Sequence, residues 1–228
     1  MSDVKFIDGF EDIARDAMNE IDEKLTEKFV TLIKFLSDNH DACAKLKGKN
    51  APRIGSKDFI IKIAGLFSES RHPKKPAKPA TVPDEMVGVV LHVFFDFNKD
   101  DLPRIQKEHS FSMGAENIIG DLLERYLSHK LEPHGWIWCS GTIVKAVDFI
   151  KLNEKDNSWT LLQVKNRDNT ENSSSSAIRH GTKIIKWFRT FSKKKGSNWD
   201  AFPDEVSTQH LSEEGFKDFV VEYLSALK

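Results

Sequence analysis

Apolar residues recur at helical spacing through the N-terminal third of the chain. One amphipathic stripe covers residues 10–21, a second covers residues 29–36, and a third covers residues 58–67. The next segment, near residues 70–83, is rich in proline and lysine, a composition typical of an extended surface loop. We therefore expect residues 1–108 to form a helical N-terminal region that contains this Pro/Lys loop.

The longest apolar run of the chain, Met86–Phe97, contains twelve residues. A membrane-spanning helix needs about 20, so the run predicts a helix or strand of the protein core and no membrane association. The two cysteines, Cys43 and Cys139, are too few for a disulfide framework. The acidic, amphipathic N-terminus does not have the pattern of a signal peptide. Together these features indicate a protein of the reducing cytoplasm.

Between residues 141 and 165 the pattern becomes that of strands. Residues 141–150 and 159–165 are predicted strands, and the polar residues 153–158 between them supply turn chemistry, which indicates a β-hairpin. An amphipathic helix is predicted over residues 112–131, before Pro133 and Gly135. A second helix is predicted over residues 182–191.

The hairpin carries three side chains with complementary chemistry. Gln163 and Lys165 share one face of the second strand because side chains alternate along a strand, and antiparallel pairing can bring Asp148 close to both. A carboxylate, a second oxygen ligand and an ammonium group around one point are what metal-assisted phosphodiester hydrolysis requires. The spacing itself is degenerate, and a hairpin that carries these residues by chance is the alternative.

This arrangement resembles the PD-(D/E)xK nuclease core, with Val147 in place of the proline and Gln163 in place of the second acid. The resemblance implies an α/β fold, with a central mixed sheet flanked by helices in residues 109–228. It also implies a Mg²⁺ ion held by Asp148, Gln163 and the backbone carbonyl of Val164, with Lys165 activating the attacking water. A glutamine keeps an oxygen ligand but removes a charge, so we expect weaker Mg²⁺ binding than with glutamate.

Glu116 is the further acid that the predicted helix offers. It lies three residues before Ile119 and seven before Leu123, on the apolar side of the helix, where a carboxylate needs a partner. In the PD-(D/E)xK fold a helix just before the hairpin commonly lends a glutamate to the site, so Glu116 is a candidate catalytic residue and a possible metal ligand. The alternative is an acid favoured by the dipole of the helix N-terminus. Glu124 falls on the polar flank and is expected to be solvated.

The segment after Lys165 has the composition of a DNA-contacting surface. From Gln163 to Trp199 there are nine Lys/Arg residues against two acids, in a chain whose net charge is −1. Arginine can read guanine, asparagine can pair with adenine, and Ser-rich helix starts suit phosphates. A capped loop followed by a solvated helix is the alternative. The candidate DNA-binding residues are Arg167, Asp168, Asn169, Asn172, Ser173, Ser174, Ser175, Ser176, Arg179 and Lys183.

Three sequence motifs together resemble the SinI family of type II restriction endonucleases. They are Met113–Asn117, Val147–Phe149, and the run from Gln163–Arg167 into Glu171–Ser176. The resemblance covers roughly residues 110–190. It implies a bacterial homodimer that cleaves double-stranded DNA at a GGWCC-like palindrome with Mg²⁺. A cytosine methyltransferase is then expected as a genetic partner rather than a physical one. The rival interpretations are a structure-specific repair or junction nuclease and a non-catalytic DNA-binding protein.

Overall fold

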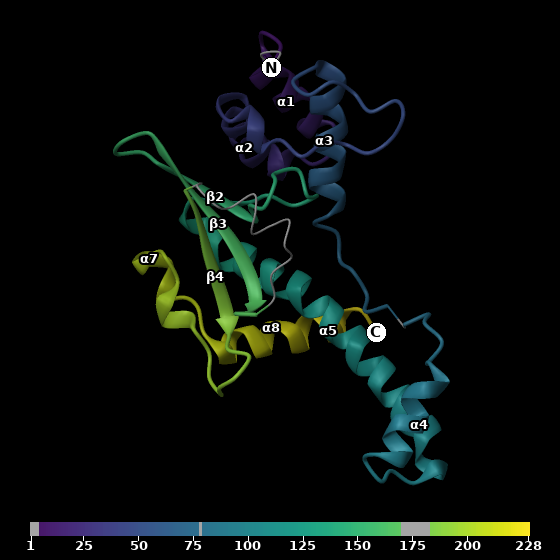
Figure 1. Cartoon of the computed structure of the whole chain (residues 1–228). Helices are drawn as coiled ribbons and strands as arrows, with labels where there is room; N and C mark the ends of the chain where they lie inside the picture. Colours follow the sequence, from purple (N-terminus) through teal and green to yellow (C-terminus); the bar gives the residue numbers. More distant parts are fainter. Residues whose placement is uncertain (1–4, 78, 170–182) are drawn as a thin grey trace.

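The computed structural model describes residues 5–77, 79–169 and 183–228. Within these ranges the protein is a mixed α/β structure, in which a four-stranded sheet lies between two groups of helices (Figure 1). The α/β class with a mixed sheet and flanking helices, predicted from the sequence, is confirmed. None of the described helices combines the length and the hydropathy that crossing a membrane requires.

The N-terminal helices pack together at one end of the molecule (Figure 1). They are α1 (Phe10–Asn19), α2 (Thr26–Asp38) and α3 (Lys57–Glu69), with the 3-10 turns η1 (Glu23–Leu25) and η2 (His40–Ala42) on either side of α2. Each helix buries the apolar stripe seen in the sequence, so tertiary packing rather than intrinsic propensity provides most of their stability.

A long helix, α5 (Leu102–Leu131), runs from the far end of the molecule back to the sheet (Figure 1). Its 30 residues correspond to about 45 Å. Pro103 stands in its first turn, where the missing N–H of proline is harmless. The 3-10 turn η4 (Glu132–His134) and Gly135, with a φ of 83°, end the helical path before the first strand.

The sheet has the order β1-β2-β3-β4. Its strands are β1 (Trp136–Trp138), β2 (Phe149–Asn153), β3 (Ser158–Arg167) and β4 (Ile184–Thr190). The pairs β1–β2 and β2–β3 are antiparallel, whereas β4 runs parallel to β3. The predicted hairpin is therefore present as β2 and β3, although its first strand begins at Phe149 rather than Gly141.

The prediction of a helix over residues 182–191 is wrong, because residues 184–190 form β4. Ile184, Ile185, Trp187 and Phe188 fit helical spacing, but they are also β-branched and aromatic residues that strands prefer. Pairing of these residues with β3 favours the strand over the helix. Trp187 lies beside Val164 in the register, and both side chains are buried.

The two faces of the sheet are covered by different helices. On one face Ile137 and Ile150 pack against the core of α1, α2 and α3. On the other face Phe149, Leu162 and Val164 pack against α5 and α8 (Glu213–Ala226). Two short elements, η5 (Trp199–Ala201) and α7 (Glu205–Thr208), connect β4 to α8.

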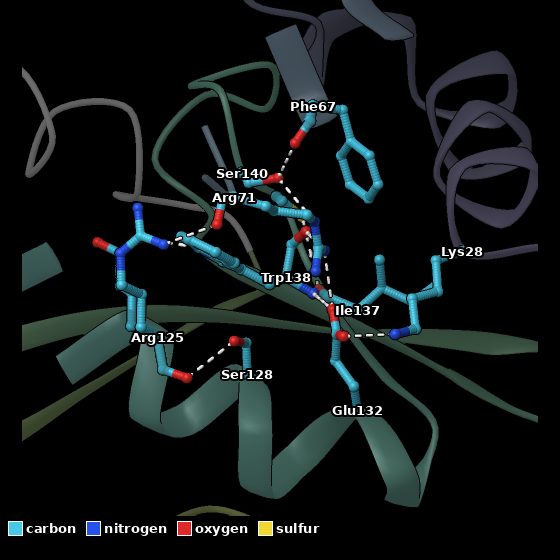
Figure 2. A network of polar contacts seen from close by, with 11 residues as sticks. Lys28, Phe67, Arg71, Arg125, Ser128, Glu132, Ile137, Trp138 and Ser140 are labelled. Carbon is cyan, nitrogen blue, oxygen red and sulfur yellow. Dashed lines mark hydrogen bonds and ion pairs between the residues drawn. The ribbon is translucent and has the colours of Figure 1, made fainter. Parts of the chain in front are cut away.

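A partly buried ionic network joins the N-terminal helices to the sheet (Figure 2). The Arg71 guanidinium, just after α3, bonds to Glu132 at 2.8 Å and to the Trp138 carbonyl at 2.8 Å. Lys28 of α2 binds the other oxygen of Glu132 at 2.6 Å. The Arg125 guanidinium donates to the carbonyls of Ser70 and Arg71, each at 2.9 Å. The residues that support β1 therefore come from α2, the end of α3 and α5.

One part of the molecule projects away from this body (Figure 1). It consists of α4 (Glu85–Val93), residues 94–101, which include the 3-10 turn η3 (Lys99–Asp101), and the start of α5, residues 102–113. We call residues 85–113 the arm. The sequence predicts Met86–Phe97 as part of the protein core, but this prediction is wrong: most of its large apolar side chains are exposed.

Candidate active site

Asp148 is fixed at the beginning of β2 by three hydrogen bonds. Its backbone N–H donates to the Leu162 carbonyl at 2.8 Å, and its own carbonyl accepts from Cys139 N at 2.8 Å. Its side-chain Oδ2 accepts from the backbone nitrogen of Val164 at 2.7 Å. The carboxylate is therefore held against β3 by the main chain itself.

Gln163 and Lys165 lie on β3 beside this carboxylate. The antiparallel register ends with Phe149 opposite Leu162, so the next step places Asp148 opposite Gln163, as the hairpin pattern predicts. Gln163 is 1% exposed, and its Oε1 is buried without a hydrogen-bond partner in the described part of the chain. Lys165, two residues further on the same face, is half-buried.

The Val164 backbone contributes a further oxygen at the same place. In an extended strand the N–H and C=O groups of one residue point to the same edge. The Val164 N–H donates to Asp148, so its carbonyl faces the edge on which Asp148 lies. The pairing of β3 with β2 has ended two residues earlier, at Leu162.

The acid of α5 that interacts with Asp148 and Lys165 is Glu124, whereas Glu116 is exposed. Glu124 of α5 is half-buried, and its Oε2 accepts from Trp138 Nε1 at 2.9 Å. The prediction that Glu124 is solvated is therefore wrong. The prediction that Glu116 lies on the buried side of the helix is also wrong, because it is exposed on the part of α5 that precedes the sheet.

The pKa values of the Glu124 and Asp148 carboxyl groups are both raised, and Asp148 contributes to the shift of Glu124. Burial, and then the nearby Asp148 carboxylate, raise the pKa of Glu124 to about 8, against the opposing effect of the Trp138 bond. Burial also raises the pKa of Asp148, although the Val164 N–H and the Lys165 ammonium act in the opposite direction. Two half-buried acids with raised pKa values, next to a lysine, are typical of a functional site.

The donor set of the site suits a hard divalent cation. It comprises the Asp148 and Glu124 carboxylates, the unpartnered Gln163 amide oxygen and the Val164 carbonyl. Mg²⁺ typically binds one or two carboxylates and completes its shell with water and substrate phosphate oxygens. No cluster of three or more His, Cys, Asp or Glu side chains that could hold a metal occurs among the residues that the structure describes. The residues present therefore fit Mg²⁺ as a mixed set of side-chain and backbone oxygens.

Some of the candidate DNA-binding residues lie within the described part of the chain, and the others lie outside it. Arg167 ends β3 and is exposed, as are Asn169 and Lys183. Asp168 Oδ1 accepts from Ser192 N at 2.8 Å, and contacts with Ser192 lower the pKa of this acid. Asp168 thus connects the end of β3 to the loop after β4. The remaining candidates, Asn172, Ser173, Ser174, Ser175, Ser176 and Arg179, lie outside the described residues.

The basic run Lys193–Lys195 lies in the loop that follows β4, and all three side chains are exposed. The Arg189 side chain of β4 interacts within the protein. It donates to Asn166 Oδ1 at 3.0 Å and forms an ion pair with Glu213 of α8. Of these basic residues, the loop lysines are therefore the ones exposed for contact with a polyanion.

Comparison with known proteins identifies the family. The model of the SinI restriction endonuclease family matches residues 10–226. The chain belongs to this family. It is 55% identical over 223 residues to the type II restriction enzyme Eco47I of Escherichia coli, covering 97% of each protein. It is 54% identical over 226 residues to the type II restriction enzyme SinI of Salmonella infantis, covering 99% of this chain and 98% of the relative. This family member is a type II site-specific deoxyribonuclease.

Two site residues of this SinI-family enzyme escaped the sequence analysis, Glu124 and Trp138. Glu124 lies at the margin of the apolar stripe of α5, one residue after the buried Leu123 and three before the buried Leu127. It accepts a hydrogen bond from the indole of Trp138, which comes from β1. Helical periodicity alone cannot reveal this contact because it is tertiary.

Proposed function

We propose that this restriction endonuclease hydrolyses double-stranded DNA with Mg²⁺ in a PD-(D/E)xK-type site formed by Asp148, Gln163, Lys165, Glu124 and the Val164 carbonyl. The observation that carries the proposal is the hydrogen bond that holds the Asp148 carboxylate beside Val164, next to the buried and unpartnered Gln163 oxygen. A buried acceptor without a donor is costly, and a cation would satisfy it.

Each side chain has a defined role in this proposal. Asp148, Gln163 and the Val164 carbonyl would hold the cation, and Glu124 would be the second carboxylate of the site. When bound, Mg²⁺ would stabilise the charge that develops on the phosphate and lower the pKa of a coordinated water. The Lys165 ammonium orients the attacking water toward phosphorus. The half-buried position of Asp148 and Glu124 reduces their contact with water and strengthens the electrostatic interactions of the site.

The substrate proposal is a GGWCC-like palindrome cut by a homodimer, and it rests on the family resemblance. A palindrome presents two equal half-sites, and a two-fold symmetric protein matches them. Arg167, at the end of the catalytic strand, reads a base near the scissile phosphate, whereas Lys193, Lys194 and Lys195 contact phosphates. A cytosine methyltransferase protects the host's own sites as a genetic partner.

Digestion of a plasmid of known sequence with purified protein, with and without Mg²⁺, tests this function. We expect a reproducible set of discrete fragments that requires Mg²⁺, with ends that map to one short palindrome. Structure-dependent nicks would instead indicate a repair or junction nuclease. Retained DNA binding without any cleavage would indicate a non-catalytic DNA-binding protein, and either result would overturn the proposal.

A further inference from the structure

The arm exposes an unusual number of large apolar side chains. Phe94 is 77% exposed and Val93 is 72% exposed, and other valines, methionines and phenylalanines of α4 and its surroundings are also exposed. A helix that is apolar on all sides is normally buried, yet within α4 only Gly88 is buried. The exposed residues are Met86, Val87, Val89, Val90, Val93, Phe94, Phe95, Phe97, Phe111 and Met113.

The other residues that the structure describes leave this surface uncovered. The arm projects from the body, and α4 lies at the end of the molecule away from α1, α2 and α3 (Figure 1). One side of α4 packs on α5, where Gly88 approaches Leu102 and Gln106. The other sides of α4 keep the exposed residues described above.

The size of the exposed surface matches that of a stable protein interface. A fully buried phenylalanine removes about 150–250 Å² from water, so the four exposed phenylalanines alone present roughly 450 Å². Monomers rarely expose contiguous apolar patches beyond a few hundred Å². With the valines and methionines added, the area approaches the ~800 Å² that each partner contributes to a standard interface.

The charge of the arm argues against DNA or an anionic membrane as its partner. The arm contains five acids against three Lys/Arg residues: Glu85, Asp96, Asp100, Asp101 and Glu108 against Lys99, Arg104 and Lys107. Both DNA and anionic lipid surfaces select the opposite balance. The nine residues of α4 are also far fewer than the ~20 that span a bilayer.

The arm has the shape that a contact between identical copies requires. In a two-fold interface the same patch lies on both copies, so it must contain protrusions and a hollow to receive them. Phe94 and Phe95 are exposed at the end of α4. A hollow between α4 and α5 is lined by the apolar Val89, Val93 and Leu102 and also by polar residues, which are Glu85, His92, Lys99 and Gln106. Both features are on one arm.

We propose that the arm is the dimerisation element of this enzyme, and that its occupant is the arm of a second copy of the chain. The phenylalanines of each copy fill the hollow of the other. This inference deepens the proposed function, on whose homodimer it rests, by assigning the subunit contact to α4 and the start of α5 rather than to the sheet or α8. The DNA-contacting strands then remain free to face the substrate.

The molar mass of the protein without DNA, measured by light scattering, tests the proposal. We expect the wild type to have about twice the 26.0 kDa of one chain and the variant V93D to have the mass of one chain. V221D is the matched control, because Val221 is a 58% exposed valine on another helix, α8, and its dimer should persist. Thermal unfolding of both variants verifies that each is folded, since neither position is buried.

A crosslinking experiment provides a second measurement that does not depend on disrupting the interface. Cys43 and Cys139 are both buried, so a cysteine introduced at the surface is the accessible thiol. With a short bis-maleimide, V93C should give a covalent dimer, whereas V221C should remain a single chain.

A monomeric wild type, a V93D variant that remains dimeric, or failure of V93C to crosslink would overturn the assignment of the arm. A failure of the arm proposal can be distinguished from a failure of the proposed nuclease function. A wild type that is dimeric through the arm but does not cut DNA would contradict the proposed nuclease chemistry and leave the arm's role supported.

Discussion

The Asp148 carboxylate accepts a hydrogen bond from the backbone nitrogen of Val164 at 2.7 Å. This contact joins the first residue before β2 to the centre of β3, at the point where the pairing of the two strands ends. It fixes one acidic oxygen of the site by the main chain and leaves the other oxygen of Asp148 available to a cation. The register of β2 and β3 places Gln163 opposite Asp148, and Lys165 lies on the same face of β3, two residues further on.

The identity of the helix-borne acid can be tested by a matched pair of substitutions in α5. We expect E124Q to lower cleavage by about 10–100-fold, the typical effect of removing a group that supports a metal site. E116Q should cleave at the wild-type rate, because Glu116 is exposed on the part of α5 away from the sheet. Initial rates at saturating Mg²⁺ measure both. A strong loss in E116Q with a normal E124Q would reverse the assignment.

The unpartnered oxygen of Gln163 predicts a graded response to Mg²⁺. Q163M removes the amide oxygen at similar volume and should require a higher Mg²⁺ concentration for half-maximal cleavage. Q163E adds a carboxylate, which hard cations prefer, and should retain cleavage with a lower Mg²⁺ requirement. Titration of Mg²⁺ against cleavage rate gives the comparison. Equal Mg²⁺ requirements in all three proteins would exclude Gln163 from the ligand set.

Base reading and phosphate contact can be separated at Arg167 and Lys194. R167A should lose about 1–3 kcal/mol of affinity for the cognate duplex and relax selectivity at one base pair. K194A should weaken binding to every duplex alike and reduce the salt dependence by about one unit. Titration against cognate and single-mismatch duplexes at two salt concentrations distinguishes the roles. An equal loss by R167A on every duplex would make it a backbone contact.

Asp204 should make the stability of the enzyme depend on pH in the acid range. Burial alone would raise the pKa of Asp204, but hydrogen bonds from Lys151, Trp136 and Ser207 outweigh it and lower the pKa to about 2. A carboxyl whose pKa is lower in the folded state stabilises the fold above its ordinary pKa of 3.8. That stabilisation is lost as the pH falls from about 4 toward 2.

The variant D204A tests this account of acid stability. At pH 7 it should be less stable than the wild type by roughly 1.5–3 kcal/mol, because charge-assisted hydrogen bonds are lost and the Trp136 N–H loses its partner. The difference should shrink as the pH is lowered toward 2, where about half of the wild-type carboxyl groups are protonated. Urea unfolding at several pH values measures the difference. A difference that stays constant across the acid range would remove Asp204 as its cause.

The parts of the site that lie within one hairpin could be predicted from the sequence. Alternation along residues 159–165 and the turn at residues 153–158 are enough to place Asp148 near Gln163, because antiparallel register follows from local pattern. The helix before the hairpin could likewise be predicted from its apolar spacing, although α5 begins earlier, at Leu102.

The parts that depend on tertiary contacts could not be predicted. Residues 184–190 have apolar positions that suit either a helix or a strand buried on both faces, and pairing with β3 decides for the strand. Glu124 accepts a hydrogen bond from Trp138, a partner 14 positions away in the sequence. The apolar run Met86–Phe97 has the hydropathy of a core segment, although most of its large apolar side chains are exposed. Hydropathy alone cannot distinguish a protein core from an apolar surface that binds another molecule.

Cleavage of cognate DNA by D148A and K165A, measured together with DNA binding, tests the central claim most directly. Each variant should lose cleavage by about 10²–10³-fold or more, because each removes electrostatic stabilisation or water positioning at the reacting phosphate. Binding to the same duplex in Ca²⁺ or without metal should remain within a few fold of the wild type. Wild-type rates of cleavage by either variant would contradict the assignment of the active site to the β2–β3 hairpin.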